Sequence, residues 1–149
     1  MKMLVLYSSS GGNTGKVAEA IASELKCDCV RVTRSGTLGA VDLDSYDLVF
    51  VGTGIHYGGP NEDIVAYLKG VSLNRSGQFA LFITWGGAGK TNQTVFAALK
   101  ALLESKGQKV HSDAFSCYGG WNFLRRGHPN EQEIKAAKEW ATKTANNTK

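Results

Sequence analysis

The chain has 149 residues and a formal net charge of +4, with 42% hydrophobic and 20% charged residues, a balance typical of a folded domain. This length suits one domain over residues 1–149, which can bury enough apolar surface to fold without disulfides or a structural metal. No apolar run approaches the roughly 20 residues needed to cross a bilayer, and the first residues do not show a charged segment followed by an apolar run. We therefore expect a soluble, cytoplasmic protein.

The charged residues are unevenly distributed along the chain. Residues 1–75 contain 7 Lys and Arg against 8 Asp and Glu, whereas residues 76–149 contain 10 against 5. The lysines of the second half occur singly, with few aromatic residues between them, which argues against nucleic-acid binding. This half is interpreted as a solvated basic face, with an acidic protein partner or weak polyanion binding as the alternatives.

The three cysteines do not form a recognisable metal or redox motif. Cys27 and Cys29 are spaced too closely for a C-x-x-C pair, and Cys117 stands alone. We interpret all three as reduced thiols, and a redox role for Cys117 is the alternative.

In chain order, apolar runs alternate with segments of helical periodicity. The first run, residues 2–7, predicts a buried strand, and residues 15–26 have apolar side chains at the spacing of an amphipathic helix. Further strands are expected over residues 29–32, 47–52, 78–84 and 109–115, and further helices over 60–68, 92–105 and 130–140. This order predicts an α/β fold in which helices cover both faces of a five-stranded parallel sheet.

Three helix boundaries can be predicted in more detail. Pro60 is expected in the first turn of its helix, where its missing N–H costs nothing. Asn130 and Glu133 are expected to form a capping pair at the start of the last helix. Residues 141–149 are expected to be frayed.

Ligands of such a sheet bind outside the carboxyl ends of its strands, so the loops there are the candidate site. The first loop, SSSGGNT over residues 8–14, combines three hydroxyl groups and two glycines immediately before a helix. A helix N-terminus presents unpaired N–H groups and a partial positive charge, and glycine lets the backbone close around an anion. This composition predicts a neutral phosphate cradle.

The stretch YSSSGGNTGKVAEAIA, residues 7–22, resembles the phosphate-loop signature of flavodoxins, and the resemblance extends over nearly the whole chain. It implies the flavodoxin-like three-layer α/β/α sandwich, a strand order of 2-1-3-4-5, and bound FMN. It also implies that the phosphate is held by Ser9, Ser10, Gly12, Asn13 and Thr14. Gly11 belongs to the same loop but stands where the family usually has a hydroxyl.

The resemblance assigns the flavin ring to two further loops. The second loop, GTGIHYGGP over residues 52–60, offers Gly54, Ile55, His56, Tyr57 and Gly58. His56 or Tyr57 would stack on the ring, and the Gly58–Gly59 peptide would reorient on reduction. The third loop offers Trp85, Gly86, Gly87 and Gly89. The tyrosine that flavodoxins commonly place here is missing, since Lys90 stands near its position. Trp85, or the loop over residues 117–121 that includes Trp121, would cover the second ring face instead.

The resemblance implies an FMN-containing electron carrier that shuttles single electrons at low potential between redox partner proteins. No catalytic residue and no metal ligand is expected. The partners are expected to be redox proteins, and acidic, ferredoxin-like ones would suit the basic half of the chain. The carrier itself is expected to be a monomer or weak dimer.

Other functions remain open at this point. The run from Ile55 to Gly58 also resembles a loop of flavodoxin-like protoporphyrinogen dehydrogenases, and glycine-rich third loops occur in quinone reductases of this fold. Either would make the protein an FMN-dependent oxidoreductase. Gly89-Lys90-Thr91 reproduces the end of a P-loop, but Thr84 stands where that motif requires its first glycine. A flavin-free binding domain of the same fold is the last alternative.

Overall fold

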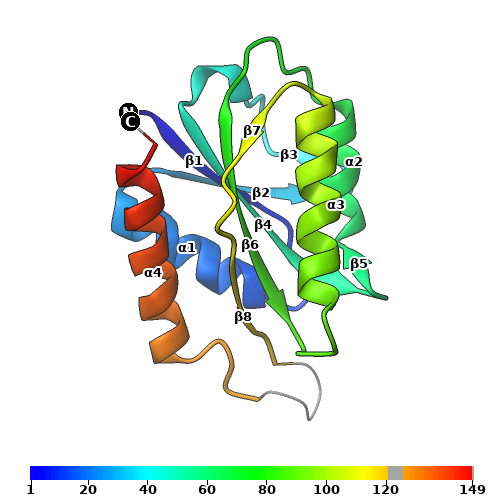
Figure 1. The fold of residues 1–149 in the computed structure, drawn as a ribbon, viewed down its shortest axis with the longest axis vertical. Coiled ribbons are helices and arrows are strands. Elements are labelled where there is room, and N and C mark those ends of the chain that lie inside the picture. Colours follow the sequence, from blue (N-terminus) through cyan, green and yellow to red (C-terminus); the bar gives the residue numbers. More distant parts are fainter. Residues whose placement is uncertain (121–125, 149) are drawn as a thin grey trace.

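The computed structural model describes residues 1–120 and 126–148, and its strands form one twisted sheet with helices on both faces (Figure 1). The strands are β1 (Met3–Tyr7), β2 (Asp28–Thr33), β3 (Gly36–Thr37), β4 (Leu48–His56), β5 (Gly59–Pro60), β6 (Gln78–Trp85), β7 (Lys109–Val110) and β8 (Phe115–Tyr118). The helices are α1 (Asn13–Leu25), α2 (Glu62–Gly70), α3 (Thr91–Ser105) and α4 (Glu131–Asn146), with a short 3₁₀ turn, η1 (Leu43–Ser45).

The strand order is β3-β2-β1-β4-β6-β7, and β8 also pairs with β6. The pairs that build the central sheet are parallel, whereas β3 and β5 are short antiparallel additions to β2 and β4. If the short antiparallel strands β3 and β5 are left out, the order β2-β1-β4-β6 followed by β7 and β8 corresponds to the predicted order 2-1-3-4-5. β7 and β8 both pair with β6 and together take the place of the fifth strand. The predicted flavodoxin-like α/β fold is therefore confirmed.

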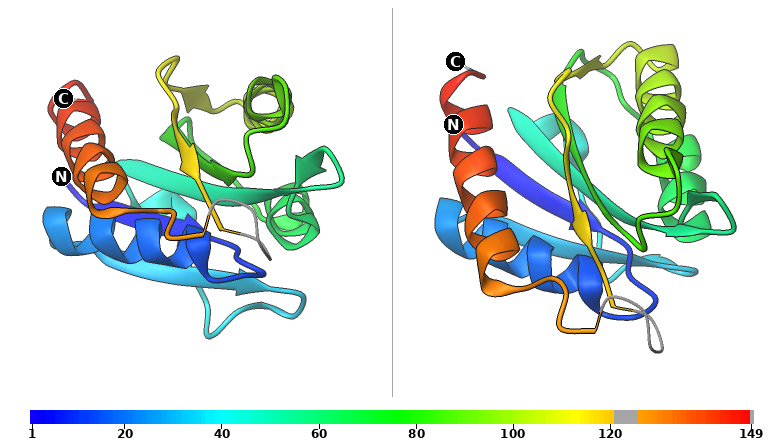
Figure 2. Two further views of the ribbon diagram at one scale, coloured as in Figure 1. Left: turned by 90° about the horizontal axis from the view of Figure 1, so that it is seen from below. Right: turned by 60° about the horizontal axis from the view of Figure 1, so that its bottom comes forward.

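Successive strand residues face opposite sides of the sheet, so the apolar runs supply two cores at once. In β1, Leu4 and Leu6 pack in the core under α2 and α3, whereas Val5 packs under α1 and α4. Figure 2 (left) shows these two helix pairs on opposite sides of the sheet. A strand buried on both faces cannot shift by one residue without placing its side chains in the wrong core, so the register is well determined.

Three predicted element boundaries are wrong. Pro60 lies in β5, opposite Ile55, and α2 begins only after Asn61, whose side chain accepts the Asp63 N–H at 2.9 Å. The last strand is split into β7 and β8, since the Asp113 carbonyl between them accepts the indole N–H of Trp140 at 3.0 Å. Helix α4 continues to Asn146 instead of fraying after residue 140, because its later turns include buried side chains.

Other local predictions are confirmed. The Asn130 side chain accepts the Glu133 N–H, and the Glu133 carboxylate accepts the Asn130 N–H, so α4 begins with the predicted capping box. Both distances are 2.9 Å. Within residues 1–120 and 126–148, no helix is long and apolar enough to cross a membrane.

Candidate functional site

The loops that follow β1, β4, β6 and β8 meet at one edge of the sheet and enclose a pocket of about 490 Å³. The view from below in Figure 2 (left) looks onto this edge, toward which the arrowheads of β6 and β8 point in Figure 1. The pocket is lined by Ser9, Ser10, Gly11, Asn13, Thr14, Gly54, Ile55, His56, Tyr57, Thr84, Trp85, Gly86, Gly119 and Gly120. Three stretches that are far apart in the sequence and were predicted to form one site therefore do converge.

The first loop ends at the N-terminus of α1. Gly12, with a φ of 87°, is the N-cap residue, and its N–H donates to the Ser9 hydroxyl at 3.0 Å. This left-handed backbone conformation favours glycine, because a side chain there would be strained. The first N–H groups of a helix have no intrahelical partner, so this end of the pocket offers hydrogen-bond donors to an anion.

Side-chain hydrogen bonds connect this loop to the others. The hydroxyls of Thr14 and Thr84 lie 2.8 Å apart in a buried pair, and the Asn13 amide donates to the Gly120 carbonyl at 2.8 Å. On the opposite side, the Asn61 amide donates to the Ser10 hydroxyl at 3.2 Å. The pocket floor is therefore held by contacts between residues that are 51 to 107 positions apart.

The second loop is a β-hairpin formed by β4 and β5. Its two turn residues, Tyr57 and Gly58, have φ angles of 50° and 78°. Positive φ at both positions matches the two-residue hairpin turn that suits the twist of the strands, but it is unusual for a bulky residue such as tyrosine. The Tyr57 side chain is fully exposed, at 109% of its reference area, and stands at the pocket rim.

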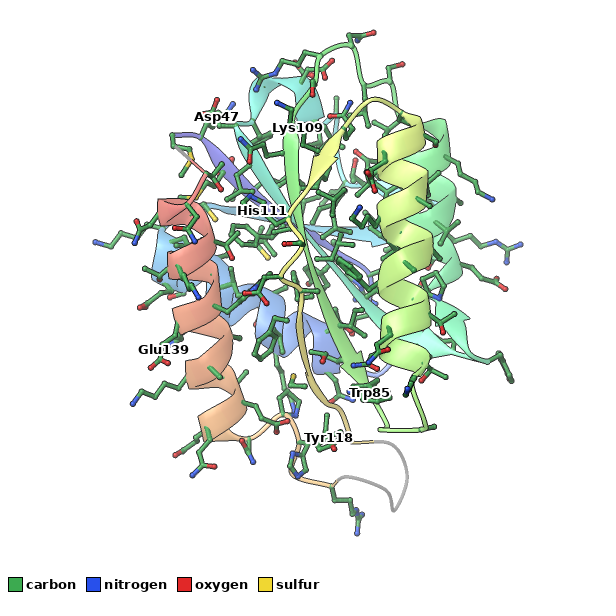
Figure 3. All side chains as sticks on the ribbon, viewed as in Figure 1. Asp47, Trp85, Lys109, His111, Tyr118 and Glu139 are labelled. Atoms are coloured by element: carbon green, nitrogen blue, oxygen red, sulfur yellow. The ribbon has the colours of Figure 1, made fainter. Side chains whose placement is uncertain are left out.

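The third loop contributes Trp85 and Gly86. The Trp85 ring stacks on the Tyr118 ring of β8, with centroids 6.2 Å apart and planes inclined by 27° (Figure 3). The Gly119 N–H donates to the Trp85 carbonyl at 2.9 Å, which joins the loop to the segment after β8. We call the Trp85–Tyr118 pair the aromatic wall, and of the two rings it is Trp85 that lines the pocket.

Helix α4 supports this wall from behind. The Glu133 carboxylate accepts the N–H of Tyr118 at 2.9 Å and is paired with the His128 ring, while the His128 carbonyl accepts the Gly120 N–H at 2.9 Å. Burial acts to raise the pKa of Glu133, but hydrogen bonds from Asn130, His128 and Tyr118 outweigh it and lower that pKa. A charged carboxylate thus holds the segment that carries Gly119 and Gly120.

Some predicted site residues lie outside the pocket lining. Gly12 and Gly58 occupy the N-cap and the hairpin turn, and Gly87 and Gly89 have positive φ angles of 84° and 60° in the loop before α3. They shape the loops and do not face the pocket. Lys90 is exposed at the start of α3, and Trp121 lies outside the described residues.

Three lining residues were missing from the predicted site. Thr84 was treated as the end of a strand, and its pairing with Gly54 and its bond to Thr14 depend on strand register. Gly119 and Gly120 follow β8 directly, in the loop over residues 117–121 that was considered only as an alternative cover for the second ring face. A glycine pair at the carboxyl end of a strand was the signal for them. Burial raises the pKa of Cys117 to about 12, and the nearby Glu133 adds to this, so the thiol stays protonated in the core.

The architecture is that of the flavodoxin-like α/β proteins. Residues 4–126 match the flavodoxin domain family, and the chain belongs to this family, which typically binds FMN. An uncharacterised protein of Methanocaldococcus jannaschii is 31% identical over 150 residues, covering 95% of this chain and 96% of the relative.

Solved structures agree in fold. A WrbA-like flavodoxin from Agrobacterium tumefaciens superposes with a TM-score of 0.81 at 17% identity, covering 99% of this chain and 96% of the other. A flavoprotein in complex with FMN from Lactobacillus acidophilus superposes with a TM-score of 0.63 at 24% identity, covering 77% of this chain and 91% of the other. At these identities the similarity establishes the fold alone.

Proposed function

We propose that this chain binds FMN in the pocket and acts as an electron-transfer protein that passes single electrons between redox partner proteins. The observation that carries the proposal is the convergence of a neutral, hydroxyl-rich loop at a helix N-terminus with an aromatic wall in one pocket. The hydroxyl-rich loop suits a phosphate group, and the aromatic wall suits a flat ring.

Two features of the pocket fit FMN. Its volume of about 490 Å³ lies within the usual range of small-molecule sites. Its lining includes Asn13 and Thr14 of the first turn of α1, where a helix offers unpaired N–H groups to a phosphate. Membership of the flavodoxin family agrees with both features.

In this proposal the phosphate is held by the hydroxyls of Ser9, Ser10 and Thr14 and by backbone N–H groups of Gly11 and Asn13. Ile55, His56 and Tyr57 would face the ring from the hairpin, and Trp85 and Gly86 would face it from the third loop. Bound FMN supplies the electron-transfer chemistry. The chain orients the ring, limits its contact with water, and leaves the rim near Tyr57 open to a partner.

The test is anaerobic reduction of the purified protein after reconstitution with FMN, followed by absorbance. We expect one FMN per chain and two separate one-electron stages. Reduction in a single two-electron step, followed by rapid reoxidation by a quinone, would instead favour an FMN-dependent oxidoreductase. If the protein does not bind FMN at all, the proposal is wrong.

We further propose that the partner is an acidic redox protein. Exposed basic side chains lie on the elements and loops at the pocket edge: Lys16, Arg31, Arg34, Lys90 and Arg126. Two exposed carboxylates, Glu62 and Glu131, begin helices at the same edge. The excess of positive charge would attract an acidic surface to the side on which the ring is accessible.

A further inference from the structure

A single arginine on β2 contacts the first loop. β1 and β2 are parallel neighbours, and their register places Arg31 beside Tyr7, the last residue before the loop. The Arg31 guanidinium Nη2 donates to the Ser9 carbonyl at 2.8 Å. The side chain is otherwise exposed, so the cation lies at the edge of a loop that carries no charge of its own between residues 8 and 15.

This hydrogen bond also orients the loop backbone. In a trans peptide the C=O of one residue and the N–H of the next point in opposite directions. Because the Ser9 carbonyl points to Arg31, the Ser10 N–H points away from Arg31. The Ser9 hydroxyl is held in turn by the Gly12 N–H at 3.0 Å. Ser9 is therefore fixed at both of its oxygens, and the peptide that follows it has one defined direction.

We propose that Arg31 makes the pocket select phosphorylated FMN over unphosphorylated riboflavin. It holds the Ser9–Ser10 peptide so that the Ser10 N–H can be donated to the phosphate, and its positive charge, on the other side of that peptide, attracts the phosphate dianion at longer range. The planar guanidinium holds the Ser9 carbonyl more rigidly than an ammonium group would. This inference rests on the proposed binding of FMN.

The test compares dissociation constants for FMN and riboflavin by quenching of flavin fluorescence. We expect Arg31→Gln to weaken FMN binding about tenfold, equivalent to about 1.4 kcal/mol, and to leave riboflavin binding within about twofold. Arg31→Lys keeps the charge and loses the fork, so we expect an intermediate loss of about threefold. The matched control is Arg34→Gln, which removes an exposed arginine of the same segment and should leave both constants unchanged.

The possible outcomes separate the two proposals. If the unmodified chain does not bind FMN, the proposed function fails, and this inference fails with it. If it binds FMN but Arg31→Gln loses affinity for both flavins equally, or for neither, the proposed function stands and the role of Arg31 is overturned. Thermal unfolding of the flavin-free variants checks that each one is folded.

Discussion

At the scale of single residues, the buried hydroxyl pair of Thr14 and Thr84 joins the first and third loops at the pocket floor. Thr84→Val would leave the Thr14 hydroxyl buried without its partner, which costs about 1–3 kcal/mol. We expect urea unfolding of the flavin-free protein to show this loss in free energy. The double variant Thr14→Val/Thr84→Val removes both hydroxyls and should be more stable than Thr84→Val alone. An equal or greater loss in the double variant would contradict this account.

Gly119 is a second position at which a small change of side chain should affect the pocket, because it lies against Asn13. A Cβ at this residue would lie 2.9 Å from the Asn13 amide nitrogen, which donates to the neighbouring Gly120 carbonyl. We therefore expect Gly119→Ala to displace Asn13 and weaken FMN binding about fivefold, a coupling of about 1 kcal/mol. The measurement is a double-mutant cycle with Asn13→Ala. Once Asn13 is truncated, only the 3.1 Å contact with its Cβ remains, so Gly119→Ala should cost less than in the unmodified protein. Fully additive losses would refute the proposed contact.

At the scale of elements, the C-terminus of α2 is capped by the side chain of Lys106, the C-cap residue directly after α3. The Lys106 ammonium donates to the carbonyls of Leu68, Lys69 and Val71 at 2.8, 3.1 and 2.5 Å. We expect Lys106→Met to lower the free energy of unfolding in urea by about 1–2 kcal/mol, since a cation near a helix C-terminus satisfies its last carbonyls. Lys100→Met, within α3 itself, is the control. It removes only a surface ion pair with Glu104, so its cost should stay near 0.5 kcal/mol.

The start of α4 makes stability depend on pH. The folded-state pKa of Glu133 is lowered from its usual 4.5, because hydrogen bonds from Asn130, His128 and Tyr118 outweigh the effect of burial. A group with a lowered folded pKa stabilises the protein above its unfolded pKa, and this contribution is lost as pH falls through the folded pKa. We expect the stability of Glu133→Gln to change less than that of the unmodified protein between roughly pH 5 and pH 3.

The control for this pH experiment is Glu131→Gln, which alters an exposed carboxylate in the same first turn. Its pH profile should follow that of the unmodified protein. Thermal or urea unfolding at several pH values provides the profiles. Parallel profiles for Glu133→Gln and the unmodified protein would show that the carboxylate charge does not support the pocket wall.

At the scale of the whole molecule, the net charge of +4 bears on partner choice. If the partner is acidic, the rate of electron transfer from a reduced, acidic ferredoxin should fall about tenfold as salt is raised from a low to a physiological concentration or above. The reason is that exposed charges are screened within about 8–10 Å at an ionic strength of 0.1–0.15 M. Stopped-flow measurement over a salt series tests this. A rate independent of salt, or one that rises with salt, would contradict electrostatic attraction to an acidic partner.

Much of the fold could be predicted, because local patterns encode it. The apolar run of β1, the helical periodicity of α1 and the capping box at Asn130 each involve residues at most a few positions apart. The boundaries that failed depend on distant partners. The Asp113 carbonyl between β7 and β8 accepts from the Trp140 indole instead of from a neighbouring strand, and Pro60 pairs with Ile55 in β5 before α2 begins.

The candidate site was likewise predictable only in its local features. The doubly wound fold and the character of the loops follow from the sequence, since periodicity, glycine content and hydroxyl content are local properties of the chain. The structure was needed to show which of those residues face the pocket, that Thr84 contacts Thr14, and that Arg31 holds Ser9. These contacts follow from the register of parallel strands, which is set by packing on both faces of the sheet and not by any neighbouring residue.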